Sequence, residues 1–282
     1  MFSGRRHVAP ALFVLVAMAV AAAGAAAHPE PSESIEALGF ALERHPDDPL
    51  LWIERAGQYL MVGEPAAALR DLDRAESLAP YRPDVPLQRG AALLALGRAA
   101  DAERQLGLAI ERDPASEQAR VLRARARLAL GRPREAARDF ERATELSFRT
   151  SPDQYLDWAR ALDRAARIGD ALEALDRGLA AVGESPALVE EAVRLECGRG
   201  AWDEALDRIE RHPGAWGSSA ARRARRGDVL RAAGRELEAQ TEYSQALAEL
   251  EAGSRRHSAG AAALEARLHE ALRQGTPVTG RP

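Results

Sequence analysis

Small and large apolar residues recur along this chain with a fixed period of 34. Within each period an alanine is followed four residues later by a larger apolar residue and, three residues after that, by a position that is usually small. Spacings of four and three place all three positions on one face of an α-helix. The alanines that mark the six intervals, the fourth of them one residue late, are Ala68, Ala102, Ala136, Ala171, Ala205 and Ala239. The pattern therefore predicts six helices, each with one apolar face.

Glycines and prolines divide each interval into two helices. Glycine adopts the left-handed backbone conformation that ends a helix at no steric cost, and proline cannot continue a helix because it lacks the N–H donor. The residues that keep the step of 34 are Gly63, Gly97 and Gly131, then Gly200 and Gly234, and also Pro46, Pro80 and Pro114. Each interval is predicted to fold as helix, tight turn, helix.

The fourth interval departs from this spacing. Trp158 and Gly169 are as far apart as Trp52 and Gly63, but Ala171 follows Gly169 by two residues instead of five. We therefore expect the turn inside the fourth helix pair to be shortened.

The pattern resembles the tetratricopeptide repeat (TPR) family, whose 34-residue motif carries Trp, a small residue and Tyr in its first helix, then Ala, a large apolar residue, Ala and Pro. The first interval supplies Trp52, Ala56, Tyr59, Ala68, Leu72, Ala75 and Pro80 at that spacing. The resemblance covers residues 32–251. It implies an all-α, right-handed solenoid of stacked antiparallel helix pairs, with Trp52 and Tyr59 in the core.

Capping segments are expected at both ends of the array. Residues 28–46 repeat the end of the first interval one period early and should form a half-repeat that caps the N-terminal side. Residues 47–251 hold the six units, and residues 252–274 carry an apolar stripe with a polar opposite face, as a capping helix should. Residues 275–282 are expected to be a flexible tail.

Residues 1–27 differ from the repeats. Arg5 and Arg6 precede an uncharged apolar run that begins at Val8 and ends in three alanines, the small residues that signal peptidase requires. Residues 1–27 therefore resemble a signal peptide cleaved after Ala27. The alternative is a retained membrane anchor, because the uncharged segment 8–27 is long enough to span a bilayer. Either interpretation predicts an exported chain, periplasmic or secreted, or held at the membrane by its N-terminus.

Composition supports a helical fold and a protein partner. Only 5% of the residues are aromatic, and Ala and Leu, both good helix formers, dominate the apolar 46%. All 39 basic residues are Arg and the chain has no Asn, which indicates a GC-rich, bacterial coding bias. Without Arg5 and Arg6 the chain has 37 basic and 43 acidic residues, a formal charge of −6 that disfavours nucleic acid as a partner.

The sequence lacks the motifs of common catalytic and metal sites. We find no zinc-protease helix, phosphate-binding loop, nucleophile elbow or paired-cysteine site, and no two of the six histidines are three or four residues apart. We therefore expect no catalytic residue, no cofactor and no metal. Cys197 is the single cysteine and is expected to be a small buried thiol; an intermolecular disulfide is the alternative.

The resemblance also implies a binding surface, because first helices line the concave side of TPR stacks. The family's ligand-facing positions map onto Leu50, Ile53, Leu60, Met61, Leu87, Leu94, Val121, Arg125 and Leu128. This predicted groove is mainly apolar and suits an amphipathic helix or an extended hydrophobic peptide. Chaperone-binding family members clamp a peptide carboxylate with Lys and Asn, which this chain lacks, so that activity is not expected.

Arginines form a second candidate site. They are Arg55, Arg89, Arg123 and Arg226, each just before the small residue of a first helix, with Arg222 and Arg223 nearby on the first helix of the sixth unit. One interpretation is contact with an acidic partner, or for the sixth unit with anionic lipid or glycan, because Arg binds carboxylates through two parallel hydrogen bonds. The other is a solvated face whose guanidinium groups pair with neighbouring carboxylates such as Glu54, Asp84 or Glu117.

The sequence therefore predicts a non-catalytic scaffold or adaptor that binds another protein or peptide in the bacterial cell envelope. We expect a monomer or a weak homo-oligomer. Two alternatives stay open: a membrane-associated structural protein held by residues 8–27, and a regulatory subunit of an enzyme encoded nearby.

Overall fold

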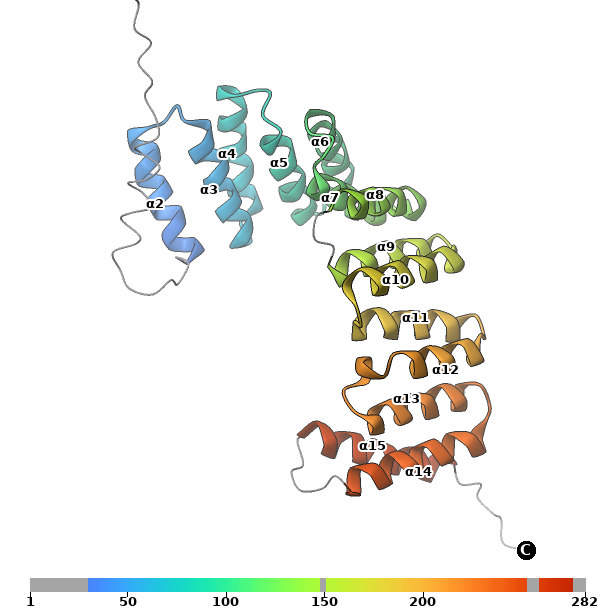
Figure 1. Ribbon diagram of the computed structural model, residues 1–282. Coiled ribbons are helices and arrows are strands. Elements are labelled where there is room, and N and C mark those ends of the chain that lie inside the picture. Colours follow the sequence, from blue (N-terminus) through green and yellow to red (C-terminus); the bar gives the residue numbers. More distant parts are fainter. Residues whose placement is uncertain (1–29, 148–150, 253–258, 276–282) are drawn as a thin grey trace, which may run out of the picture. The chain divides into compact units, whose positions relative to one another are not determined.

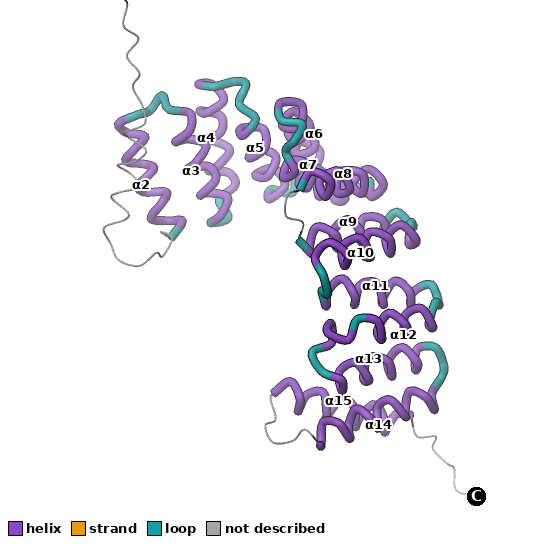
Figure 2. The backbone as a smooth tube through the Cα atoms, in the orientation of Figure 1, coloured by secondary structure: helices purple, strands orange, loops and turns teal. Residues whose placement is uncertain are grey.

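The computed structural model describes residues 30–147, 151–252 and 259–275, and all regular structure in these ranges is helical (Figures 1 and 2). The described residues form fourteen α-helices and one 3₁₀ turn, so the all-α prediction is confirmed. Residues 1–27, predicted as a signal peptide or anchor, lie outside the described residues, as do residues 276–282 of the predicted tail.

The chain divides into two compact units, residues 1–78 and 79–282. The first contains α2 (Pro31–Arg44), α3 (Pro49–Met61) and α4 (Pro65–Leu78). The second contains α5 (Asp84–Ala95), α6 (Ala99–Arg112), α7 (Glu117–Ala129), α8 (Pro133–Leu146), α9 (Pro152–Arg164), α10 (Ile168–Val182), α11 (Pro186–Gly198), α12 (Trp202–Arg211), α13 (Ser219–Ala232), α14 (Glu236–Ala252) and α15 (Ala259–Gly275), with the 3₁₀ turn Pro213–Trp216 after α12. We number the helix pairs repeat 1 (α3 and α4) to repeat 6 (α13 and α14).

Within each unit, every helix packs against the helix that follows it in the chain. Small residues make the close packing inside a pair feasible. A Cβ added at Gly90 of α5 would lie 2.5 Å from Cγ of Leu106 on α6, and one added at Gly227 of α13 would lie 2.5 Å from Cε1 of Tyr243 on α14. Each of these glycines therefore leaves room for a large side chain from the second helix of its own repeat.

The turn inside each repeat contains one residue with a left-handed backbone. Glycine occupies it in five repeats, with φ between 71° and 77°. In repeat 4 the residue is Ala166, with φ of 58°, and not Gly169, which lies inside α10. The prediction of a shortened turn is therefore wrong. Ala166 precedes Ala171 by the usual five residues, and the extra residue of this interval falls in the connection from α8 to α9.

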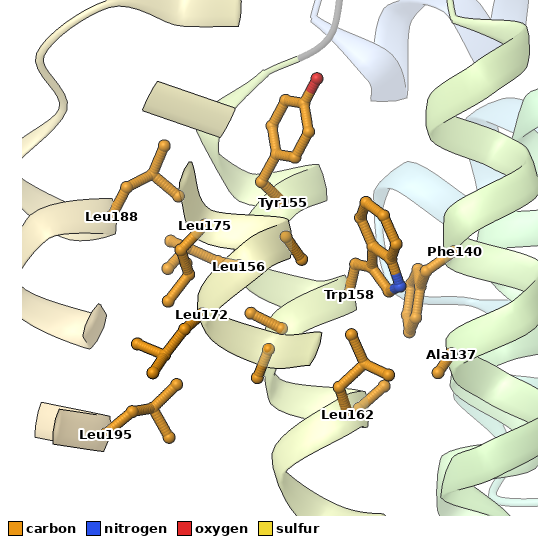
Figure 3. Close-up of a cluster of buried hydrophobic side chains, with 14 of the residues drawn as sticks. Ala137, Phe140, Tyr155, Leu156, Trp158, Leu162, Leu172, Leu175, Leu188 and Leu195 are labelled. Atoms are coloured by element: carbon orange, nitrogen blue, oxygen red, sulfur yellow. The ribbon is translucent and has the colours of Figure 1, made fainter. Parts of the chain in front are cut away.

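A cluster of buried side chains joins repeats 3, 4 and 5 in the second unit. Figure 3 shows its centre, where Trp158 of α9 points toward Phe140 of α8 while Leu172 and Leu175 of α10 fill the side toward α11. A second cluster, which includes Tyr243 and Leu268, runs from α11 to α15. Among the described helices, none combines the length and apolarity needed to cross a membrane.

Candidate protein-binding face

The predicted groove positions of α3, in the first unit, are unequally exposed. Leu50 and Met61 are 48% and 70% exposed, and Leu60 is half-buried. Ile53 is only 6% exposed, so its side chain belongs to the core and offers little surface to a ligand.

In the second unit, the predicted groove residues lie on α5 and α7, two first helices that contact each other. Leu87 and Leu94 of α5 are half-buried, as are Val121 and Leu128 of α7. We call these four residues the α5–α7 strip. Side chains of this kind already have neighbours on one side and still present apolar area to water, so a partner can cover them with little rearrangement.

The first helices α7, α9, α11 and α13 also carry charged residues. Their charged side chains pair between successive first helices. The pairs are Arg125–Asp157 at 3.0 Å, Asp163–Arg194 at 2.8 Å, Glu190–Arg225 at 2.8 Å and, from α13 to α15, Asp228–Arg267 at 3.3 Å. Hydrogen bonds to Glu191 and then Asp163 raise the pKa of Arg194. This part of the surface is satisfied by its own partners and gives a ligand less to bind.

Three of the predicted anion-contacting arginines are engaged inside their own repeat. Each binds a carboxylate 16 residues later, on the second helix of the pair. The pairs are Arg55–Asp71 at 2.7 Å, Arg123–Asp139 at 2.7 Å and Arg226–Glu242 at 2.9 Å. Hydrogen bonds to Asp71 and Asp139 raise the pKa of Arg55 and Arg123. In repeat 2 the position that corresponds to these carboxylates holds Gln105, on the helix that follows Arg89.

These pairings determine whether the guanidinium groups are available to a partner's carboxylate. The carboxylates that bind Arg55 and Arg123 are Asp71 and Asp139, not the expected Glu54, Asp84 or Glu117. Arg55 binds through two nitrogens, as Arg123 does, so the fork that would grip a partner's carboxylate is occupied.

The basic helix α13 is also neutralised by acids of the protein. Arg222 binds Glu210 at 3.0 Å, and Arg223 binds Glu249 at 2.6 Å and Glu242 at 3.1 Å. The run of arginines in the sequence is therefore not a bare cationic surface in the fold.

Trp52 and Tyr59 are half-buried, with the guanidinium of Arg55 between them. Its Cζ lies 5.0 Å from the centre of the Trp52 ring and 5.8 Å from that of Tyr59. The two rings therefore hold the arginine through cation–π contact as well as contributing apolar area.

Repeats 4 and 5 have other contacts in place of this arginine–carboxylate pair. These contacts were not predicted from the sequence. In repeat 4 the arginine position holds Trp158 and the matching acid position holds Ala174, both buried. In repeat 5, Arg208 lies on the second helix and binds Glu196 on the first at 2.7 Å. Burial lowers the pKa of Arg208, but hydrogen bonds to Glu196 and Asp176 raise it overall.

Cys197 lies on α11 as a half-buried free thiol. Burial raises the pKa of the thiol, which favours its protonated form. In the ranges that the structure describes, no group of three or more His, Cys, Asp or Glu side chains is placed to hold a metal ion.

Stacked two-helix repeats, left-handed turns at a constant position and small residues at the helix contacts define a TPR-like repeat protein. Residues 192–270 match the family model described as a tetratricopeptide repeat-like domain. No curated protein matches the sequence.

Solved structures with the same fold agree with this class. YrrB, described as a TPR protein with an unusual peptide-binding site, is 16% identical, with a TM-score of 0.54 over 67% of this chain and 96% of its own. A tetratricopeptide repeat protein from Parabacteroides merdae is 17% identical, with a TM-score of 0.51 over 86% of this chain and 90% of its own. The APC/C hetero-tetramer Cut9–Hcn1 includes a chain 15% identical, with a TM-score of 0.52 over 85% of this chain and 46% of its own. At these identities the likeness concerns the fold alone.

Proposed function

We propose that the chain is a non-catalytic scaffold that binds a segment of another protein on the α5–α7 strip. The observation that carries this proposal is that two first helices in contact carry four half-buried aliphatic side chains, Leu87 and Leu94 on α5 and Val121 and Leu128 on α7. An amphipathic helix or an extended apolar peptide would bury them. Because the strip is built on packed helices, binding requires little ordering of the protein.

The fold relatives support a binding role. YrrB is described as having a peptide-binding site, and Cut9–Hcn1 is described as a hetero-tetramer. TPR repeats are typically non-catalytic, and the sequence adds no recognisable catalytic motif to them.

The place of action that we propose is the bacterial cell envelope, with the repeats outside the cytoplasm. The support is the N-terminal segment: Arg5 and Arg6, an apolar run from Val8, and small residues up to Ala27. Carbonate extraction of membranes separates the two forms of this proposal. Release of a shortened chain that begins at His28 supports a free adaptor, and retention of the full-length chain supports a membrane-anchored one.

The test of the binding surface is cross-linking in the native envelope, with wild type compared with Leu87→Glu/Leu128→Glu. The matched control is Leu108→Glu on the second helix α6, where the leucine is 40% exposed but lies off the strip. We expect wild type and the control to cross-link the same protein and the strip variant to lose it, with all three showing equal helix content by circular dichroism. Equal capture by the strip variant would contradict the proposal.

A further inference from the structure

A cleft opens on the same face where repeat 3 meets repeat 4. Its volume is about 390 Å³, and it lies between α7 and α9. Val121, with the small exposed edge of the 2%-exposed Phe140, forms an apolar wall. The charged residues Glu117, Asp153, Asp157 and Arg125 and the neutral polar residues Gln118, Ser151 and Gln154 line the rest. Val121 also belongs to the α5–α7 strip, so the cleft continues that strip and one bound segment could reach both.

The cleft lies at the junction where the spacing of the repeats changes. The connection from α8 to α9 is where the fourth interval holds its extra residue. Asp153 is in the first turn of α9 and Glu117 in the first turn of α7, so both carboxylates are at the same end of their helices. The cleft thus has acidic groups at one end and the aliphatic side chain of Val121 beside them.

The charges of the cleft do not balance. Three carboxylates face a single guanidinium, that of Arg125, which already binds Asp157 at 3.0 Å. Glu117 accepts a hydrogen bond from the neutral amide of Gln154. Asp153 is exposed and makes no ion pair with any residue that the structure describes. Neither Glu117 nor Asp153 therefore has a cationic side chain as an ion-pair partner among the residues that the structure describes.

We propose that this cleft receives an arginine or lysine side chain from the protein segment that the α5–α7 strip binds. The aliphatic stem would cover Val121, and the cationic head would reach Glu117 and Asp153. The inference rests on the proposed function and adds the partner's chemistry: an apolar segment followed by a cation. The apolar wall favours a long organic cation over a bare metal ion, since a metal ion needs oxygen ligands on all sides.

A set of fluorescent model peptides tests the inference. Each is an 18-residue amphipathic Leu/Ala/Gln helix with one Arg moved through four successive positions, and each has a twin in which neutral citrulline replaces Arg. Fluorescence anisotropy at physiological salt measures binding. We expect at least one register in which the Arg peptide binds wild type about tenfold more tightly than its citrulline twin.

Variants separate the cleft from general attraction. In Glu117→Gln/Asp153→Asn the tenfold preference should disappear while citrulline peptides bind as before. The matched control is Asp163→Asn, which removes an acid of the next first-helix contact that already binds Arg194; it should keep the preference. Thermal melting by circular dichroism checks that each variant is folded.

The possible results separate a failure of the cation site from a failure of the proposed function. Two results would overturn the cation site without contradicting binding at the α5–α7 strip. One is a preference for Arg that survives in Glu117→Gln/Asp153→Asn. The other is equal binding of Arg and citrulline peptides by wild type in every register. Peptides that fail to bind wild type, or that bind Leu87→Glu/Leu128→Glu equally well, would overturn the proposed function and the cation site with it.

Discussion

Repeats 3 and 5 join their two helices by the same kind of ion pair with the charges exchanged. In repeat 3, Arg127 on the first helix binds Asp139 on the second at 2.8 Å. In repeat 5, Glu196 on the first helix binds Arg208 on the second at 2.7 Å. Both pairs span 12 residues. Opposite charges at these two positions therefore satisfy each other whichever of the two helices carries the acid.

Repeat 4, between them, carries neither the arginine nor the carboxylate and packs without an ion pair at these positions. Trp158 and Ala174 take the positions that Arg123 and Asp139 hold in repeat 3, and both join the apolar cluster in Figure 3. Arg177 places its guanidinium 5.7 Å from the Trp158 ring. Repeats with an internal ion pair and repeats with an apolar contact can thus be neighbours in one chain, provided that no buried charge is left without a partner.

The largest expected effect comes from introducing into repeat 4 the arginine of the ion pair without its carboxylate. Trp158→Arg removes a buried aromatic side chain and leaves a cation facing Ala174, so we expect a loss of about 5 kcal/mol in the free energy of unfolding. Adding Ala174→Asp supplies the acid at the matching position and should recover about 1–3 kcal/mol. Urea unfolding followed by circular dichroism measures both. A double variant no more stable than Trp158→Arg would show that the positions are not equivalent across repeats.

The next effect tests the reversed pair of repeat 5. Glu196→Ala leaves the buried guanidinium of Arg208 with Asp176 alone, and we expect a loss of about 3 kcal/mol. Exchanging both charges, Glu196→Arg with Arg208→Glu, should recover part of that loss, because only the contact with Asp176 becomes unfavourable. An exchanged variant less stable than Glu196→Ala would contradict the view that polarity is free. Unfolding in urea is again the measurement.

The fold could be predicted from the sequence because packing between stacked helices repeats with the chain's own period of 34. The ion pairs were missed because an arginine's partner depends on which helix faces it. Glu54 directly precedes Arg55, and adjacent residues on a helix do not face each other. A signal was present: Asp71, Asp139 and Glu242 each follow an arginine by 16 residues, which a comparison of repeats at that offset would have shown.

The turn of repeat 4 was predicted wrongly because glycine was treated as the only residue for a left-handed turn. Counting back five residues from Ala171, as in the other repeats, gives Ala166. The α5–α7 strip followed from the resemblance, but the cleft beside it could not, because its width depends on how α7 and α9 pack. Sequence periodicity describes contacts that every repeat shares and says little about a junction that departs from them.

A smaller effect compares the turns of repeats 3 and 4. Ala166 adopts φ of 58°, a conformation that costs a residue with a Cβ about 1–2 kcal/mol, whereas Gly131 takes the same place at φ of 71°. Ala166→Gly should therefore stabilise the protein by about 0.5–1 kcal/mol, after allowance for the greater freedom of glycine in the unfolded chain. Gly131→Ala should destabilise it by about as much, since no atom would obstruct the added Cβ. Melting temperatures that shift in the same direction for both variants would refute the equivalence of the turns.

The smallest effect should come from the exposed pairs between successive first helices. Asp163→Asn removes one acid from Arg194, which is half-exposed and keeps Glu191 at 3.1 Å, so we expect a loss below about 1 kcal/mol. Salt should shrink that loss further, because it screens exposed charges, but should leave the loss from Glu196→Ala nearly unchanged, because that pair is enclosed. Unfolding measured at two sodium chloride concentrations checks both statements. A salt-independent loss of about 2 kcal/mol or more for Asp163→Asn would mean that the lateral pairs hold the stack as firmly as the interior ones, and the contrast between the two kinds of pair would fail.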